Sequence, residues 1–527
     1  MAQANVIKSG PVSAGIVGFQ PLFAVGAVLI GSFLASFDTR LFSLALPDIR
    51  GAMSLSFDEG AWLSTTTSAS QILIAPAVAW LATVFGLRRV LGIPSLVYAV
   101  ISLLIPFVKD YNSLLALSFV HGILLGTFVP ATLMIIFRNL PIKWWLPTIA
   151  IYCIRVGFST NSGISLAGFY VDHVGWQWMY WQDVFVAPLM GLFVYLGTSH
   201  EVVDKDLLKQ ADWGGMLLLG VGMAMVYAGL DQGNRLDWLG SGAVVGLLGG
   251  GGLLCAGFFV NESLVAHPWA HFEVLFSRNI GFALAATLLY TFTSISNSSL
   301  APNFLATIGQ LRPQQSGPLF LTFAILPMAF LVPLSIYLIR HHDVRLVLVA
   351  GLASFAAAGL LGTELTHDWS LNDFIPMVLL QSVGQSFTLL SIIIIVLSNS
   401  DPTRATAFSA YIQVMRLGGA ETGVALMGTW LRIREQVDSN LIGLKISAGS
   451  ADVSHALASL TGRFISHGAG VAQARGAAML AATVQRQANT MAYVDGFWLT
   501  VWCAIAALAC AAMIGVAPPG PLSPEQE

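Results

Sequence analysis

Long runs of apolar residues, separated by short polar connections, repeat along almost the whole chain. An α-helix rises about 1.5 Å per residue, so about 20 apolar residues cross the hydrocarbon core of a bilayer. Runs of that length predict about fourteen transmembrane helices. They cover residues 22–46, 60–84, 90–108, 112–137, 146–170, 180–198, 211–231, 240–260, 279–300, 316–339, 344–364, 373–397, 406–430 and 496–516.

Composition supports a membrane protein. Of the 527 residues, 56% are hydrophobic and only 10% are charged, whereas roughly a quarter of the residues of a soluble domain are charged. This balance excludes a water-soluble globular protein. The net charge of -3 leaves no excess of Lys and Arg for a phosphate backbone, which excludes nucleic acid as a partner. The sequence therefore predicts an all-α integral membrane protein in contact with the lipid bilayer.

Basic residues in the short connections predict the orientation, because cytoplasmic loops carry the excess of Lys and Arg. If the N-terminus is cytoplasmic, the inner connections hold Lys8, Arg88, Arg89, Arg138, Lys143, Lys205, Lys209, Arg278, Arg340, Arg345 and Arg404. The outer connections hold Arg50, Lys109, Arg235 and Arg312. This bias predicts both termini in the cytoplasm for an even number of spans. No small-residue cleavage site follows the first apolar stretch, so we interpret it as a retained span.

One outer connection is much longer than the others. Residues 431–495 are polar and Ala-rich, with helix-like stretches over 454–467 and 472–491. Long ordered loops commonly have a function. The segment could dock a periplasmic adaptor protein that leads to an outer-membrane channel, or it could cover the outer mouth as a lid. The alternative is a helical hairpin that rests on the membrane without a partner.

Few ionisable side chains fall within the predicted spans. Such residues are costly at membrane depth and are functional candidates by default. They are Asp38, Arg40, Arg155, Arg416 and Glu421, with His121 as a further titratable group.

Asp38 and Arg40 lie two residues apart, which separates their side chains by about 200° around a helix. Only one of them can therefore face a central cavity. A buried carboxyl group can load and release a proton, which makes Asp38 a candidate proton carrier. A structural ion pair is the alternative for Asp38, and a structural role is expected for Arg40.

Glu421 is a second candidate proton carrier. It follows Gly418 and Gly419, which allow another backbone to approach closely and so favour a buried position. The alternative is a salt bridge between helices, to Arg155 or Arg40.

The remaining intramembrane groups have two interpretations each. Arg155 and Arg416 could tune the titration of the carboxyl groups or hold an anionic substrate. His121 could relay protons, although a packing histidine is the more common reading.

Motifs for enzymatic chemistry are missing. Neither the phosphate-binding pattern GxxxxGK[ST] nor the zinc pattern HExxH occurs. His341 and His342 share a short connection with too few further ligands for a metal. We therefore expect no enzyme activity, no metal and no cofactor.

Rows of small residues predict close helix packing. Gly242, Gly246 and Gly250 lie four residues apart in the span over 240–260. Gly163 and Gly168 end a Ser- and Gly-rich stretch in the span over 146–170. A role in gating is the alternative to packing for these glycines.

Several segments in order along the chain carry a family resemblance. They are Phe37 to Thr39 with Leu44 to Pro47, Trp80 to Arg89, Gly163 to Gly168 with Trp176 to Tyr180, Asp212 to Gly215, Gly229 to Gly233, Arg416 to Gly419, and Gln487 to Phe497. In this order and spacing they resemble the major facilitator superfamily, specifically its fourteen-span drug:proton antiporter branch of the EmrB/QacA type. The resemblance covers about residues 25 to 510.

The resemblance implies a major facilitator fold, with two six-helix halves and two additional helices between them. The corresponding boundaries are a cytoplasmic tail over 1–21, an N-terminal half over 22–198, a linker with two spans over 199–278, a C-terminal half over 279–516 and a cytoplasmic tail over 517–527. It also implies a loop motif between the second and third spans, at Thr83, Gly86, Arg88 and Arg89.

Departures from the family pattern bear on the mechanism. The acidic residue of the loop motif is Thr83 here, and the arginine that the family carries in its fourth span is Ser118. Either proton coupling has moved to Arg155 with Glu421 or His121, or the transporter runs on a different driving force. We favour the first reading because Asp38 and Arg416 are both retained.

The function implied by the resemblance is a proton-coupled antiporter that exports amphipathic small molecules or drugs across the bacterial inner membrane by alternating access. The three arginines against two acids at membrane depth favour organic acids or neutral lipophiles over cations. An importer or exporter of metabolites or organic acids on the same fold is one alternative. A non-transporting membrane scaffold is another.

Overall fold

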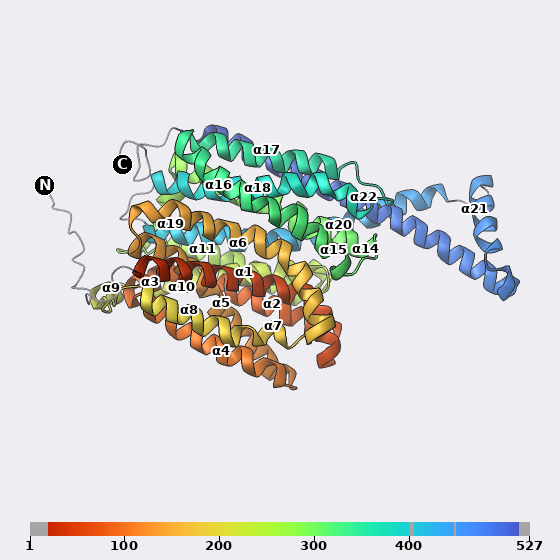
Figure 1. Ribbon diagram of the computed structural model, residues 1–527. Coiled ribbons are helices and arrows are strands. Elements are labelled where there is room, and N and C mark those ends of the chain that lie inside the picture. The colour runs from red at the N-terminus through yellow and green to blue at the C-terminus, as the bar shows by residue number, and fades with distance from the viewer. Residues whose placement is uncertain (1–18, 400–404, 447–449, 516–527) are drawn as a thin grey trace.

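The computed structural model describes residues 19–399, 405–446 and 450–515. These residues form a bundle of long, roughly aligned helices, from one end of which a helical hairpin projects (Figure 1). The C-terminal tail, most of the N-terminal tail, Lys8 and Arg404 lie outside the described residues.

The first group of helices covers the predicted spans one to six. Its members are α1 (Gln20–Met53), α2 (Phe57–Ile74), α3 (Val78–Phe85), η1 (Arg88–Gly92), α4 (Ile93–Leu104), η2 (Ile105–Phe107), α5 (Tyr111–Asn139), α6 (Ile142–Phe169), η3 (Tyr170–Val174), α7 (Trp178–Trp181) and α8 (Asp183–Gly197). Helix α1 packs against α5, α6 and α8, and α2 packs against α5.

The linker region supplies two long helices. Its elements are α9 (Lys205–Lys209), α10 (Trp213–Gly233), η4 (Trp238–Gly240), α11 (Gly242–Leu264) and α12 (Glu273–Phe276). Helix α10 packs against α2 of the first group and α20 (Gly419–Lys445) of the last group, whereas α11 packs mainly on α10. The linker therefore connects both groups through α10.

The last group covers the predicted spans nine to fourteen. Its remaining members are α13 (Arg278–Ile295), η5 (Ser296–Leu300), α14 (Ala301–Thr307), α15 (Pro313–Phe320), η6 (Leu321–Ile325), α16 (Leu326–His341), α17 (Val344–Gly362), η7 (Leu371–Phe374), α18 (Ile375–Asn399), α19 (Ala405–Gln413), η9 (Val414–Gly418), α21 (Ala451–Gly462), η10 (Ile465–His467) and α22 (Ala469–Met513). Helices α17, α18, α20 and α22 pack around α13.

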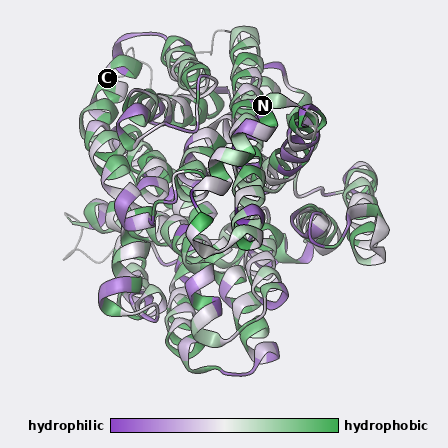
Figure 2. Ribbon diagram, turned by 90° about the vertical axis from the view of Figure 1, so that its right-hand side faces the viewer, coloured by the Kyte–Doolittle hydropathy of each residue, from purple (hydrophilic) through white to green (hydrophobic). Residues whose placement is uncertain are grey.

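Fewer helices than predicted have the length and hydropathy that a membrane span requires. Within the described residues, eleven helices are long and apolar enough to cross a membrane, or twelve if α2 and α3, which meet at a 54° bend, form one span. Hydrophobic positions run through the helices with hydrophilic ones interspersed (Figure 2). The other two predicted spans coincide with α6 and with α19, η9 and α20, which carry more polar side chains. Fourteen spans remain a prediction.

Capping side chains define several helix starts. Ser56 accepts a hydrogen bond from the Glu59 backbone N–H at 3.2 Å, and the Glu59 side chain accepts one from the Ser56 backbone at 2.8 Å. The Asp110 and Asp212 carboxylates cap α5 and α10 in the same manner, each at 2.8 Å. Such caps satisfy backbone donors that have no partner within the helix.

The long outer segment is almost wholly helical. Helix α20 extends to Lys445, beyond the predicted end of its span, and α22 runs without a break for 45 residues from the segment into the bundle. Helices α21 and α22 pack against each other and project from the bundle (Figure 1). We call residues 431–446 and 450–495 the outer hairpin.

The two helix groups meet closely at the end of the bundle near the outer hairpin. A Cβ atom on Gly168 of α6 would lie 2.7 Å from Cγ of Gln314 in α15. A Cβ atom on Gly317 would lie 3.0 Å from Cα of Ser165. The side-chain amide of Gln314 also donates a hydrogen bond to the Gly168 carbonyl at 3.3 Å. Small residues therefore allow α6 and α15 to seal this end.

The glycine row in α11 does not form the predicted packing surface. Cβ atoms on Gly242 and Gly246 would meet nothing within 4 Å, and one on Gly250 would meet only Met225. The close contact between α10 and α11 lies instead at Gly222 and Gly251, where a Cβ on Gly251 would be 2.8 Å from the Gly222 carbonyl oxygen. The prediction for Gly242 and its row is therefore wrong, because three faces of α11 carry glycine and the regular spacing marked an exposed one.

Candidate functional site

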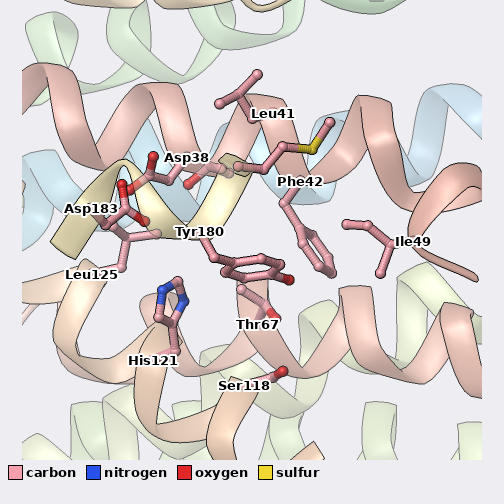
Figure 3. A pocket seen from close by; sticks show the side chains of 12 residues that line it. Asp38, Leu41, Phe42, Ile49, Thr67, Ser118, His121, Leu125, Tyr180 and Asp183 are labelled. Carbon is pink, nitrogen blue, oxygen red and sulfur yellow. The ribbon is translucent and has the colours of Figure 1, made fainter. Parts of the chain in front are cut away.

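Two carboxyl groups meet in the interior of the first helix group. Asp38 of α1 is 6% exposed, and Asp183, the first residue of α8, is 1% exposed. Their side chains lie within hydrogen-bonding reach of each other and face a common space (Figure 3). We call Asp38 and Asp183 the carboxyl pair.

Neutral donors surround Asp38. The Tyr98 hydroxyl donates to its Oδ2 at 2.7 Å, and the Gln182 side-chain amide donates to its Oδ1 at 3.2 Å. In the described part of the chain, no salt bridge joins Asp38 or Asp183 to a basic residue. The carboxyl pair is therefore stabilised by polar contacts and not by a counter-ion.

One carboxylate oxygen of Asp183 lacks a hydrogen bond within the described part of the chain. The Ser102 hydroxyl lies 3.4 Å from its Oδ2, but its buried Oδ1 has no hydrogen-bond donor among the described residues. A proton carried by Asp38 would supply that donor. Two buried carboxylates in contact cannot both be ionised without a large cost, so the arrangement favours one shared proton.

His121 lies beside the carboxyl pair. Its ring stacks on Tyr98 with centroids 4.2 Å apart, and its Nε2 lies 3.1 Å from the Ser102 hydroxyl oxygen. Ser102 thus stands between His121 and Asp183. A cavity of about 20 Å³, whose lining includes Asp38, His121 and Asp183, has room for about one water molecule.

Asp38 and Arg40 point to different surroundings. Asp38 faces α4 and α8, whereas the Arg40 side chain packs over Gly163 of α6, whose Cβ would lie 2.7 Å from Arg40 Cγ. Arg40 also lies near enough to Glu421 for their charges to attract. No salt bridge of 4.0 Å or less forms between them, and the Arg40 Nε and Nη2 atoms are buried without a partner within the described residues.

Glu421 faces the boundary between α20, α2 and the linker helix α10. Its carboxyl group lies beside Ser68 of α2, and Ser68 also faces the Tyr227 hydroxyl of α10. Asp231 lies one turn beyond Tyr227 on α10, and its carboxyl group is close enough to repel Glu421. The structure therefore brings a second pair of acidic residues together, and one of them comes from the linker.

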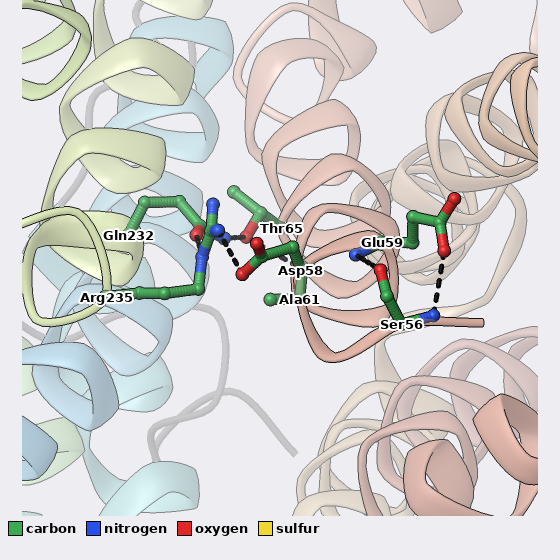
Figure 4. Close-up of polar contacts among 7 residues, drawn as sticks. All are labelled: Ser56, Asp58, Glu59, Ala61, Thr65, Gln232 and Arg235. Atoms are coloured by element: carbon green, nitrogen blue, oxygen red, sulfur yellow. Dashed lines mark hydrogen bonds and ion pairs between the residues drawn. The ribbon is translucent and has the colours of Figure 1, made fainter.

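Asp231 belongs to a polar network between α2 and α10, and Figure 4 shows its neighbours Thr65, Gln232 and Arg235. The Thr65 hydroxyl donates to Asp231 Oδ2 at 2.5 Å and accepts a hydrogen bond from the Gln232 amide. Arg235 donates to Gln232 Oε1 at 2.6 Å and pairs with Asp58 at 2.6 Å. These contacts fix the linker helix to the first helix group.

Arg155 is fully buried at the middle of α6. Its Nε donates to the Tyr152 carbonyl at 2.8 Å, its Nη1 donates to the Ser36 hydroxyl at 3.2 Å, and its guanidinium carbon lies 4.1 Å from the Tyr152 ring centroid. Its charge interacts with that of Arg416 of η9 in the last helix group. Arg416 is half-buried and donates to Gln413 Oε1 at 2.8 Å.

Gly86 and Arg88 of the loop motif contact the chain where α8 ends and the linker begins. Gly86 has a positive φ of 82°, and a Cβ there would lie 2.9 Å from the Cβ of Glu201. Glu201 in turn pairs with Arg138 at 3.6 Å. Arg88 donates to the Thr198 carbonyl at 2.5 Å.

The other two loop residues bond within their own segment. The Thr83 hydroxyl donates to the Ala79 carbonyl at 2.9 Å, and Arg89 donates to the Phe85 carbonyl at 3.2 Å. Glu201 therefore supplies an acidic group near the position where the family pattern has one and this chain has Thr83.

The described residues contain no candidate metal site. Among the residues described by the structure, no group of three or more His, Cys, Asp or Glu side chains could hold a metal ion. The His341 Nδ1 donates a hydrogen bond to the Tyr337 carbonyl at 2.8 Å.

A bundle of apolar helices in two groups, with polar and ionisable residues buried inside and between them, defines a polytopic membrane protein with the architecture of a transporter. The model of the Major Facilitator Superfamily matches residues 28–421. The chain belongs to this superfamily.

Curated relatives place the chain near the EmrB-type members, from which it has diverged. It is 23% identical to the fatty acid resistance protein FarB of Neisseria gonorrhoeae over 83% of this chain and 86% of FarB. It is 22% identical to the colistin resistance protein EmrB of Acinetobacter baumannii over 77% of this chain and 79% of that protein.

Solved structures support the same fold. The human organic anion transporter MFSD10 aligns with a TM-score of 0.53 at 14% identity, over 92% of this chain and 99% of that one. The proton:xylose symporter XylE aligns with a TM-score of 0.53 at 13% identity, over 92% and 95%. At such low identity these likenesses show the fold alone.

Proposed function

We propose that the protein is a proton-coupled antiporter that exports amphipathic small molecules across the bacterial inner membrane by alternating access. In this account residues 22–198 and 279–516 form two halves that move against each other, and residues 199–278 lie between them. Both termini face the cytoplasm, as the basic residues of the connections predict.

The carboxyl pair is the observation that carries the proposal. A transporter that exchanges protons needs a group that gains and loses a proton as its surroundings change. Asp38 and Asp183 share a buried, cation-free site, so a small change in hydration or distance alters how many protons the pair holds. In this account Asp183 partners Asp38 in a chain that lacks the family's arginine in the fourth span.

Glu421 serves as a second titratable group in this proposal. It comes from the other helix group and faces Asp231 and Arg40. A proton on Glu421 would remove its repulsion with Asp231 and its attraction to Arg40. The protonation of Glu421 would thereby change how α20 contacts both α10 and α1.

The relatives support export as the direction. The two curated relatives described above are named for resistance to fatty acids and to colistin, which are amphipathic molecules. A tripartite assembly with a periplasmic adaptor and an outer-membrane channel fits this direction, and the outer hairpin would be the docking element.

An organic-acid transporter on the same fold is the second candidate function. It is favoured by Arg155 and Arg416, which no acid neutralises among the described residues. A non-transporting scaffold is the third, and counterflow of any substrate would exclude it.

The test uses the full chain in proteoliposomes with an imposed pH gradient. Asp38→Asn and Glu421→Gln are compared with Asp206→Asn, which changes an exposed carboxylate of α9. We expect gradient-driven transport to fall at least tenfold in Asp38→Asn and to persist in Asp206→Asn. Unchanged transport and pH dependence in both Asp38→Asn and Glu421→Gln would refute the assignment of coupling.

A further inference from the structure

Two arginines without an acidic partner come from different helix groups and lie within electrostatic range of each other. Arg155 comes from α6 of the first group and Arg416 from η9 of the last group. They are close enough to repel. Within the described residues, neither guanidinium forms a salt bridge. A buried positive charge is costly unless something neutralises it.

Both guanidinium groups also have hydrogen-bond donors to spare. Arg155 Nη2 and Arg416 Nε are buried, and each lacks an acceptor among the described residues. Arg155 itself is 0% exposed. A guanidinium binds a carboxylate through two parallel hydrogen bonds, so these free donors match the oxygens of an acid.

Further unsatisfied polar atoms line the same boundary. Ser159 lies one turn beyond Arg155 on α6, and its hydroxyl has no partner within the part of the chain described. Asn297 of η5 donates to Asn161 of α6 at 3.4 Å, but its own Oδ1 accepts no hydrogen bond there. Polar side chains from both helix groups thus keep buried atoms without a hydrogen-bond partner among the described residues.

Apolar and aromatic groups lie around the arginines. The Tyr152 ring lies against the Arg155 guanidinium, and Cys153 and Tyr290 are both within electrostatic range of it. Tyr290 also packs edge-on against Phe355, with centroids 5.8 Å apart. A ligand with an anionic end and an apolar body would match this mixture.

We infer that Arg155 and Arg416 form an anion-binding site for the carboxylate of an amphipathic organic acid. The inference rests on the proposed transport function and adds the chemical class of the substrate. Each half contributes one arginine, so a bound carboxylate joins the halves and neutralises their repulsion. In the part of the chain described, no hydrogen bond joins the carboxyl pair to either arginine, although α1 carries both Asp38 and Ser36, whose hydroxyl accepts a hydrogen bond from Arg155.

Binding is measured without any pH gradient, which separates this test from that of proton coupling. The full chain in phosphatidylcholine nanodiscs is titrated with tritiated 4-butylbenzoate. Its neutral amide and a 4-butylbenzyl trimethylammonium ion serve as competitors with nearly the same apolar body. We expect the acid to bind. The amide and the ammonium ion should compete at least tenfold more weakly than the unlabelled acid.

The variants Arg155→Gln and Arg416→Gln are each expected to weaken binding of the acid at least tenfold. Arg416→Lys keeps the charge but loses the planar guanidinium group. Its affinity for the acid should lie between that of the glutamine variants and that of the parent. Arg463→Gln, at the exposed end of α21, is the matched control and should bind normally. If Arg155→Gln fails to fold, as judged by thermal unfolding, Arg416→Gln and Arg416→Lys decide the question.

Equal binding of the acid by the parent and both glutamine variants would overturn the inference, as would preferential binding of the ammonium ion. Either result would leave proton coupling by the carboxyl pair intact. Loss of gradient-driven transport in Asp38→Asn with normal binding of the acid would be the converse outcome and would support both assignments.

Discussion

The carboxyl pair shows how one contact between side chains changes the interpretation of both residues. Asp38 alone would be a buried acid with two neutral donors. Together with Asp183, whose Oδ1 has no donor among the described residues, it becomes one half of a proton-sharing unit. The free energy of such a unit depends on both carboxyl groups, so their contributions should not add.

The double variant tests this dependence. Asp38→Asn and Asp183→Asn should each lower gradient-driven transport at least tenfold, and the double variant should be no worse than the more severe single one. The measurement is the initial rate in proteoliposomes. Losses that multiply in the double variant would show that the two groups act independently.

His121 is expected to pack rather than to carry protons. His121→Gln keeps a side chain able to bond Ser102 but loses the ring that stacks on Tyr98 at 4.2 Å. We expect the free energy of unfolding to fall by about 1 kcal/mol, as for a lost aromatic pair, while transport stays within about twofold. A loss of transport as large as that of Asp183→Asn would instead make His121 part of the proton path.

Sequence reasoning found only part of this site. Asp38 was identifiable because it lies deep within an apolar run. Asp183 was overlooked because it follows Trp181 and Gln182 at the start of a predicted span, where a charged residue is expected at the membrane surface. The burial of Asp183 depends on the packing of α8 against α1 and α4, which leaves no periodic signal in the sequence.

At the scale of elements, the linker helix α10 has a more specific place than its sequence indicated. The resemblance implied only that two additional helices lie between the halves. The structure fixes α10 to α2 through Asp231, Gln232 and Arg235, and places Asp231 beside Glu421 of α20. Helix α11 makes few contacts beyond α10, so the two additional helices are not equivalent.

Paired glycine substitutions test the packing of α10. A Cβ on Gly220 would lie 2.3 Å from the Leu73 carbonyl oxygen of α2, whereas one on Gly246 of α11 would meet nothing within 4 Å. Gly220→Leu should lower the free energy of unfolding by about 1–3 kcal/mol, the usual cost of overpacking. Gly246→Leu is the control and should unfold at the parent temperature in detergent. Equal unfolding temperatures for both variants would contradict the α2–α10 contact.

At the scale of the whole molecule, the hydropathy pattern predicted the class and the helix positions, and the family model confirms the superfamily. The pattern could not fix the number of spans, because α6 and the helix through Arg416 carry the polar residues that face the boundary between the groups. It also divided α22 into a loop helix and a span, since nothing in hydropathy distinguishes a helix that leaves the membrane from one that ends there.

Orientation can be tested by labelling. Asp206→Cys in α9 and Ser459→Cys in the outer hairpin are introduced into a variant in which the four native cysteines are replaced. A membrane-impermeant maleimide should label Ser459→Cys in cells with a permeable outer membrane, and Asp206→Cys only after lysis, because the basic connections are predicted to be cytoplasmic. The opposite labelling pattern would invert the topology and the direction of the proposed export.

The most direct test of proton coupling is the proton release that accompanies substrate binding. The purified protein in weakly buffered detergent solution is mixed with a substrate that it binds, and a pH-sensitive dye reports the protons released. The parent and Asp206→Asn should release protons, whereas Asp38→Asn and Asp183→Asn should bind the substrate and release less than about a tenth as many. Undiminished release in both of these variants would show that the carboxyl pair is not the proton carrier.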